Sequence, residues 1–157
     1  MGIWVRCENS KIELDTFYST WNHIRHSLVF SFIKFLTEWT KNNSFVEGHS
    51  FEFGFCEDLK KLIIEFNNMD NQLDIDILIK LFGKYKNALS CFNFFGIYAL
   101  IDKEDCEAYY SSGNAFDIYI LIKTIKPYID KEYIKFIRLF NKICKYSIDK
   151  HLPIIIS

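Results

Sequence analysis

An acidic cluster followed by two tyrosines is the part of this sequence whose residue types most clearly suggest a chemical role. It is made of Asp102, Glu104, Asp105, Glu107, Tyr109 and Tyr110. Carboxylates steer a positively charged partner into an encounter, and tyrosines provide contact area at little cost in conformational entropy. The sequence therefore predicts that these residues bind a basic protein. The structural alternative is an ordinary solvated hairpin tip with the tyrosines packed beneath it.

The ionisable residues form no recognisable metal or nucleotide motif. The stretch from Asp102 lacks the aspartate ladder and the twelfth-position glutamate of a calcium loop. His23 and His26 lie three residues apart on a predicted helix, but that turn holds no carboxylate or cysteine. Arg25, between them, would also repel a cation. No glycine-rich phosphate loop is present. We therefore expect neither a metal nor a cofactor.

The cysteines and serines do not form a recognisable catalytic nucleophile. Cys56 and Cys106 each lie beside acidic residues, which disfavour the reactive thiolate. The five cysteines are scattered and form no C-x-x-C pair, which predicts free, buried thiols in a reducing compartment. The run 111–113 lacks the context of a nucleophile elbow. The sequence predicts a protein that is not an enzyme, with a small enzyme as the minority alternative.

Length and composition predict a single globular domain over residues 1–157. Of the 157 residues, 50% are hydrophobic and 25% are charged, which is ordinary for a folded domain. The longest apolar run, 28–36, is far shorter than the ~20 residues that span a bilayer. The first residues do not follow the pattern of a signal peptide. These features predict a cytoplasmic protein without a membrane partner.

Charge is unevenly distributed along the chain, although the formal net charge is only −1. Acidic residues dominate between 47 and 76, and basic residues dominate between 118 and 151. The small net charge argues against a general electrostatic attraction to nucleic acid, so this partner is not expected. The folded molecule could carry one acidic and one basic surface. Alternatively, the charges could lie on solvated helix faces that partly neutralise each other.

Apolar periodicity predicts a mainly α fold, with α+β as the marginal alternative. Apolar residues recur at helical spacing in five segments, near 20–41, 59–66, 77–89, 114–125 and 130–148. Asp74 and Asp130 are candidate N-caps, and Pro127 should end or kink the fourth helix.

Several remaining segments favour extended structure or a terminus docked on the body. Residues 3–8 alternate as a short N-terminal strand, and the strand formers of 97–101 predict a small β-hairpin near 97–110. Residues 51–55 could be a short strand or an extended approach to the next helix. The apolar tail 152–156 is expected to dock on the body of the domain.

Some stretches of the chain look like those of small bacterial proteins. They are Tyr18-Ser19-Thr20-Trp21 and the segment from Gly96 to Ile129, which includes Asp102-Lys103-Glu104-Asp105-Cys106-Glu107-Ala108-Tyr109-Tyr110 and Gly113-Asn114-Ala115-Phe116-Asp117-Ile118. With its small size and lack of catalytic motifs, the chain resembles the immunity proteins of bacterial contact-dependent and polymorphic toxin systems. That resemblance implies a cytoplasmic inhibitor that binds one cognate toxin domain, often a nuclease with a basic cleft.

The resemblance carries no residue roles, and two other function classes remain open. The acidic segments could cover a basic toxin cleft, but contact elsewhere on the surface is equally compatible with inhibition. A phage or mobile-element anti-defence protein would have the same profile. A nucleic-acid-binding module could instead use the basic helices between Lys123 and Lys150, and would show binding that depends steeply on salt.

Overall fold

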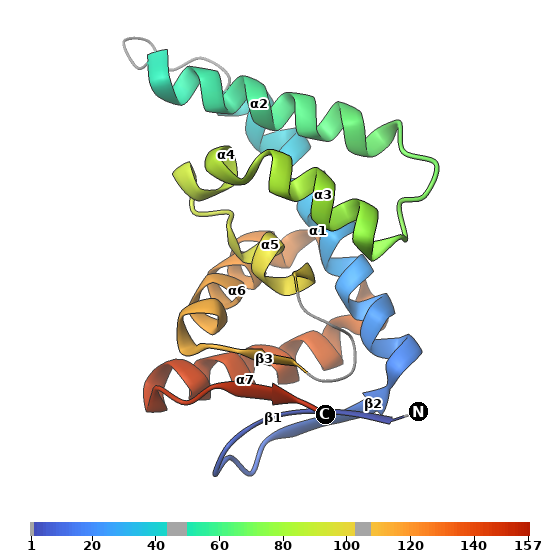
Figure 1. Cartoon of the computed structure of the whole chain (residues 1–157), viewed down its shortest axis with the longest axis vertical. Helices are drawn as coiled ribbons and strands as arrows, with labels where there is room; N and C mark the ends of the chain where they lie inside the picture. Colours follow the sequence, from blue (N-terminus) through green and yellow to red (C-terminus); the bar gives the residue numbers. More distant parts are fainter. Residues whose placement is uncertain (1, 44–49, 103–107) are drawn as a thin grey trace.

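The computed structural model describes residues 2–43, 50–102 and 108–157 as a helical body with a small sheet at one end (Figure 1). The strands are β1 (Gly2–Cys7), β2 (Glu13–Phe17), β3 (Ala108–Tyr110) and β4 (Ile154–Ile156). The α-helices are α1 (Tyr18–Asn43), α2 (Ser50–Asn67), α3 (Ile75–Lys84), α4 (Lys86–Cys91), α5 (Gly96–Ile101), α6 (Ser112–Ile125) and α7 (Ile134–Lys150). Short 3-10 turns, η1 (Lys126–Tyr128) and η2 (Lys131–Tyr133), connect α6 to α7. The predicted mainly α fold with a minor β part is confirmed.

The sheet is antiparallel and joins the two ends of the described chain. Its strand order is β2-β1-β4-β3, so β4 lies between β1 and β3. The predicted N-terminal strand is β1, and the apolar tail docks as β4. Alternate residues of β1, among them Ile3 and Val5, face inward and are buried, together with Ile154 and Ile156 of β4. Helix α7 packs against β1, β2 and β4.

Helix α1 forms the centre of the helical body because apolar side chains cover most of its circumference. It contacts α2, α5, α6 and the sheet. Phe32, Phe35 and Trp39 stack edge-on against Phe94, with centroid distances of 5.8, 5.5 and 5.2 Å. This aromatic cluster fixes the segment between α4 and α5 against the C-terminal half of α1.

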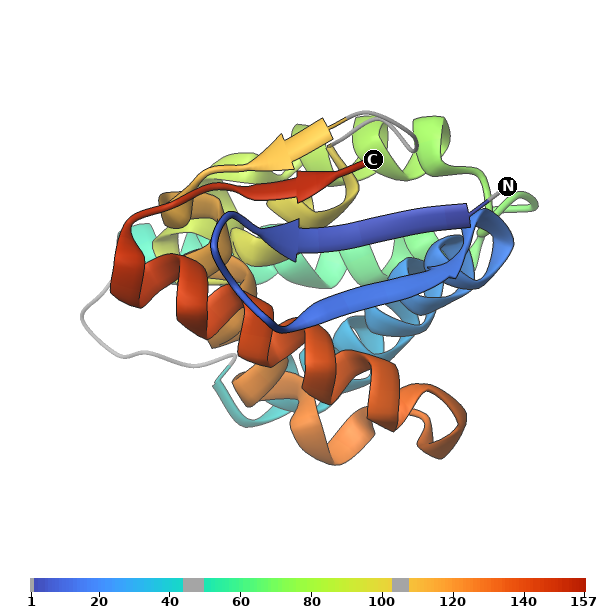
Figure 2. The same ribbon diagram turned by 90° about the horizontal axis from the view of Figure 1, so that it is seen from below.

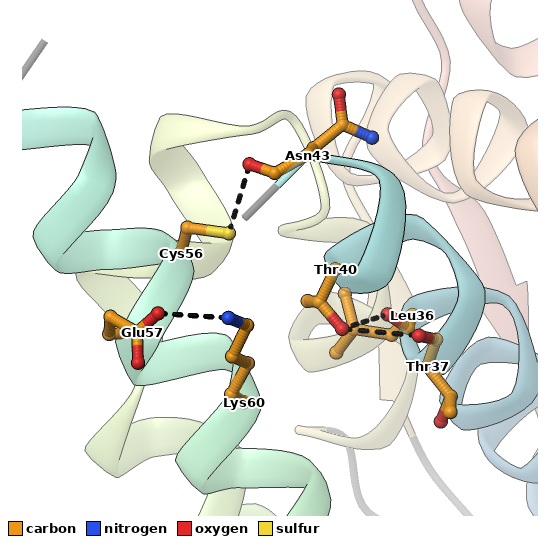
Figure 3. Close-up of polar contacts among 7 residues, drawn as sticks. All are labelled: Leu36, Thr37, Thr40, Asn43, Cys56, Glu57 and Lys60. Atoms are coloured by element: carbon orange, nitrogen blue, oxygen red, sulfur yellow. Dashed lines mark hydrogen bonds and ion pairs between the residues drawn. The ribbon is translucent and has the colours of Figure 1, made fainter. Parts of the chain in front are cut away.

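Figure 3 shows how the end of α1 is connected to the beginning of α2. The Cys56 thiol donates to the backbone carbonyl of Asn43 over 3.4 Å. Thr40, which is buried, satisfies its hydroxyl within α1 by donating to the Leu36 carbonyl over 2.9 Å. One turn after Cys56, Lys60 and Glu57 pair on the surface of α2 over 2.9 Å. The expectation of extended structure at 51–55 is wrong, since this segment continues the same helix.

The segment 97–101, expected to be a strand of a hairpin, is helix α5 instead. The first residue of α5, Gly96, lies so close to α6 that an added Cβ would be 2.3 Å from the Asp117 carbonyl oxygen. Ile97, Leu100 and Ile101 are all buried. A short apolar run that is buried on every side has no periodicity that separates helix from strand. Strand β3 pairs with β4, and residues 103–107 lie outside the described part of the chain.

The described residues form seven α-helices, whereas the sequence predicted about five. The two additional helices, α4 and α5, are too short for apolar periodicity to identify them. Asp74 caps α3 as predicted, accepting from the backbone N–H groups of Asp76 and Ile77. The predicted helix from 77 to 89 is interrupted at Tyr85, which separates α3 from α4. Pro127 ends α6 as predicted, and Asp130 caps η2.

The acidic and basic stretches of the sequence lie on different helices of the folded molecule. The acidic stretch lies largely in α2, α3 and their connection, and the basic stretch lies in α6 and α7. Helices α2 and α7 occupy opposite ends in Figure 1, at the top and the bottom respectively. The charged residues of α2 are therefore separated in space from those of α7.

Candidate protein-binding surface

The predicted partner-binding residues do not all lie at the surface, because adjacent residues of strand β3 face opposite sides of the sheet. Asp102 is exposed at the C-cap of α5, and Tyr109 is exposed on the outer face of the sheet. Tyr110 points the opposite way and is completely buried. Glu104, Asp105 and Glu107 lie outside the described residues. Because neighbouring residues of a strand face opposite sides, only one of the two tyrosines is available at the surface.

Tyr110, at the end of β3, contacts both α5 and α1. Its hydroxyl donates to the Leu100 carbonyl over 2.9 Å. It also interacts with the guanidinium of Arg25, which is fully buried and donates to Asn22 Oδ1 over 2.7 Å. Burial raises the pKa of Tyr110 and lowers that of Arg25, while each opposes the shift of the other. Tyr110 therefore stays protonated and anchors the sheet to the helical body.

The outer face of the sheet exposes three aromatic side chains. Trp4, Phe17 and Tyr109 are 44%, 69% and 63% exposed. The register places Glu13, Arg6, Ile155 and Tyr109 in one row across the four strands. Figure 2 looks onto this face, with the helices behind the strands. We call these residues, with Trp4 and Phe17, the outer sheet face.

Sequence reasoning found only part of the outer sheet face. The alternation of residues 3–8 separates Trp4 and Arg6 from the buried side of β1. Strand β2 was not predicted, so Phe17 was missed. The sequence signal for β2 is the polar–apolar–polar order of Glu13, Leu14 and Asp15, which is weak in a strand of five residues. The pairing of β4 between β1 and β3, which assembles the face, has no local signal.

A second hollow surface lies along α1. A pocket of about 410 Å³ is lined from α1 by His23, His26 and Lys34 and from the opposite side by Asp130, Glu132 and Tyr133. An adjoining hollow of about 510 Å³ is lined by Asp70 and Asp74 and shares Phe30 and Leu73 with the first. We call the two together the α1 groove. Sequence reasoning singled out His23 and His26 but did not predict this surface.

His26 is the most unusual residue of the α1 groove. Its side chain is only 9% exposed, and neither ring nitrogen has a hydrogen-bond partner in the structure as described. Burial lowers its pKa, and the positive charges of Arg25 and His23 act in the same direction. The Leu73 backbone approaches the ring and opposes this pKa shift without forming a hydrogen bond of ordinary geometry. The imidazole is therefore neutral at pH 7.

The described side chains include no metal centre, and the expectation of buried thiols is met by Cys7, Cys56 and Cys144 but is wrong for Cys91, which is exposed. No three His, Cys, Asp or Glu residues among them are arranged to hold a metal ion, although His23, His26, Asp130 and Glu132 line one pocket. Burial raises the pKa of the Cys7, Cys56 and Cys144 thiols, which keeps them protonated. These cysteines pack as small hydrophobic groups.

Comparison with known proteins adds no relative to these observations. Within residues 2–43, 50–102 and 108–157, no helix has the length and apolar character needed to cross a membrane. No protein-family model, curated protein or solved structure matches the chain.

Proposed function

We propose that this protein is an inhibitor of the immunity type, which neutralises a cognate bacterial toxin by forming a tight complex. The observation that carries the proposal is the outer sheet face with its three exposed aromatic residues. Exposed apolar groups that gather on one face are typical of interaction sites, and large aromatic side chains supply much of the binding energy at protein interfaces. Trp4, Phe17 and Tyr109 would be the main contacts.

The charges around this face support a protein partner with a basic surface. Glu13 and Asp15 on β2 are exposed on the same side as Trp4. Arg6 lies over the Trp4 ring at 5.8 Å, where it holds the indole in place as well as carrying charge. A toxin domain with a basic cleft, as in many nucleases, would meet aromatic side chains on three of the strands and carboxylates along the edge strand β2.

Blocking a cleft requires bulk as well as affinity. The outer sheet face is formed by all four strands and is supported from behind by α7. Such a rigid surface loses little conformational entropy when it binds. A toxin held against it would be excluded from its substrate by the body of the inhibitor.

The experiment is co-expression and pull-down with the product of the gene immediately upstream. We expect a stable one-to-one complex that suppresses the toxicity of the partner. Replacing Trp4, Phe17 and Tyr109 together by Ala should weaken the complex by much more than about thirtyfold, which is the factor for losing a single interface hot spot of ~2 kcal/mol.

The matched control is Ile64→Ala, because Ile64 is 59% exposed on α2, at the other end of the molecule. This variant should bind as the parent does. If the triple variant folds and still binds with full affinity, the outer sheet face is not the interface. If no partner is retained and co-expression rescues nothing, the immunity role is rejected.

Nucleic-acid binding is the second candidate, and one observation favours it. Lys135, Arg138 and Lys142 are exposed at intervals of three and four residues on α7, which places them on one face of that helix. Replacing all three by Gln should abolish binding to a DNA or RNA duplex if this face is a phosphate-binding surface. The affinity of the parent protein should then fall steeply with salt. Absence of any such binding at low salt removes this candidate.

A further inference from the structure

Strand β2 forms one margin of the sheet, and its outer edge has no neighbouring strand among the described residues. The strand order is β2-β1-β4-β3, so β2 pairs on one side only, with β1. In Figure 2, β2 is the lighter blue strand at the margin of the sheet. An edge strand carries backbone N–H and C=O groups that can pair with another chain. The edge of β2 is therefore a candidate for strand addition.

The register shows which backbone groups of β2 point to this edge. Trp4 N–H donates to the Ser157 carbonyl over 2.9 Å, and Ser157 N–H donates to the Trp4 carbonyl over 3.0 Å. Both backbone groups of Trp4 therefore point away from β2. In an antiparallel ladder, hydrogen-bonded pairs alternate with pairs that are not bonded to each other. Asp15, which lies opposite Trp4, thus directs its N–H and C=O to the free edge, and so does Glu13, opposite Arg6.

These outward backbone groups are accessible. Glu13 and Asp15 are exposed, and so is Phe17 at the end of the strand. The N–H groups of Glu13 and Asp15 donate to no atom of the described residues. Leu14, between them, is buried and pairs with Val5 of β1. The edge thus offers two sets of donors and acceptors about 7 Å apart, which is the two-residue repeat of a strand.

The side chains along this edge determine which strand fits. Glu13 and Asp15 direct their carboxylates to the same side of the sheet as Trp4, and Phe17 follows in the same line. Residues directly opposite each other on neighbouring strands interact, so opposite charges there are favourable. An added strand should therefore carry basic residues opposite Glu13 and Asp15 and an apolar residue opposite Phe17.

The same charges argue against pairing with a second copy of this chain. Two β2 strands placed side by side in antiparallel order would set Glu13 and Asp15 against the carboxylates of the other copy. Like charges directly opposite each other destabilise a strand pair, and charged side chains on edge strands protect proteins from such self-pairing. The edge is therefore suited to a partner of opposite charge.

We propose that a protein partner adds a basic strand to the free edge of β2, antiparallel to it. Asp15 donates its N–H to one partner residue and accepts from the same residue through its C=O, and Glu13 does the same with the residue two positions further along. Main-chain bonds supply affinity in this mode of recognition, and alternate side chains supply specificity. The inference rests on the proposed function for the existence of the partner and names how that partner binds.

The interaction can be tested without the natural partner. The probe is the peptide acetyl-Leu-Thr-Lys-Thr-Lys-amide, whose alternate side chains match Phe17, Asp15 and Glu13 in antiparallel order. A second peptide carries glutamate in place of both lysines. A third keeps the lysines but is methylated on their backbone nitrogens, which blocks strand pairing without changing the charge. Each is titrated into the whole protein and followed by NMR. We expect saturable shifts at the Glu13 and Asp15 amides with the first peptide and none with the others.

Hydrogen exchange provides a measurement that depends on no variant. The amides of Leu14 and Thr16 face β1, so they should exchange slowly in the free protein. Those of Glu13 and Asp15 should exchange fast, because they have no acceptor among the described residues. Saturation with the first peptide should slow the exchange of Glu13 and Asp15 and leave that of Leu14 and Thr16 unchanged.

Two variants separate the backbone from the charge. Asp15→Pro removes the outward N–H, which an edge strand tolerates, and should weaken binding of the first peptide about tenfold. Asp15→Asn keeps the N–H and removes the charge, so it should weaken binding only about threefold. The matched control is Asp76→Asn, because Asp76 is an exposed carboxylate on α3, outside the sheet. The control should leave the affinity unchanged.

The outcomes separate this inference from the proposed function. Equal binding of the first and the methylated peptide would overturn edge pairing, because charge alone would then explain the binding. No binding of the first peptide, equal binding of the glutamate peptide, or slow exchange of Glu13 and Asp15 in the free protein would do the same. If Asp15→Pro does not fold, the peptide comparison and hydrogen exchange still decide. If the toxin is neutralised normally while the edge binds no peptide, edge pairing alone fails. If the edge binds the peptide but no toxin partner exists, the immunity role alone fails.

Discussion

Arg25 and His26 are neighbours on α1, both polar and both buried, yet they face two very different regions. Arg25 faces the sheet end, where it donates to Asn22 and meets the hydroxyl of Tyr110. His26 faces the α1 groove, where its ring nitrogens find no hydrogen-bond partner among the described residues. A buried polar side chain with partners stabilises a fold, whereas one without partners costs stability.

The largest change in the free energy of unfolding is expected when the side chain of Arg25 is removed. Arg25→Ala removes a fully buried side chain together with its hydrogen bond to Asn22 and its contact with Tyr110. We expect the free energy of unfolding to fall by about 3–5 kcal/mol, measured by urea denaturation at pH 7. Arg6→Ala is the matched control, since Arg6 is exposed on the outer sheet face. If Arg25→Ala costs no more than Arg6→Ala, Arg25 is not a structural centre.

A smaller loss is expected when only the hydroxyl of Tyr110 is removed. Tyr110→Phe keeps the ring in the core but leaves the Leu100 carbonyl and Arg25 without this hydroxyl. The free energy of unfolding should decrease by about 1–3 kcal/mol. Tyr109→Phe, one residue earlier and exposed, should change it by less than about 0.5 kcal/mol. Equal effects of the two substitutions would contradict the opposite orientations of these tyrosines.

On the groove side, a change of the opposite sign is expected. His26→Leu replaces an unpartnered, buried imidazole by an apolar side chain of similar size. The free energy of unfolding should rise by about 1 kcal/mol at pH 7, because no buried nitrogen is then left without a hydrogen bond. Thermal denaturation of the two proteins provides the measurement. A clear loss of stability would mean that the ring makes favourable contacts that outweigh its unsatisfied nitrogens.

The smallest expected effect is on how the stability of the protein depends on pH. Because the pKa of His26 is lowered in the folded protein, the unfolded chain binds a proton there more readily. This contribution to stability is fully present above the ordinary histidine pKa of about 6.5 and is lost as the pH falls below it towards the folded pKa. Between pH 7 and 5, the parent should therefore lose more stability than His26→Leu. Parallel curves for the two proteins would show that His26 titrates normally.

The helices could largely be predicted from sequence because their signals are local. The apolar stripe of α1, the Asp74 cap and the stop at Pro127 each act within a few residues. The conformation of 97–101 could not, since it depends on the close approach of Gly96 to α6. The same pattern that favours a strand is compatible with a short helix when every side is buried.

The surfaces were harder to predict than the elements. Tyr109 and Tyr110 are chemically alike and adjacent, so only the pairing of β3 with β4 decides which one is buried. The α1 groove joins residues from α1, the α2–α3 connection and the turns before α7. No local pattern relates His26 to Asp130 and Glu132. Opposite charges and a buried imidazole meet there only through tertiary packing.

The position of β4 has a consequence for the order of events during synthesis. β1 leaves the ribosome before every other described element and β4 leaves after them, yet the two are neighbours in the sheet. The β1–β2 hairpin therefore cannot pair with β4 until all the described helices have emerged. Pairings between distant parts of a chain are slow to form, so the nascent protein would display an unfinished, aggregation-prone strand edge. The four-stranded outer sheet face would be complete only after β4 has paired with β1 and β3.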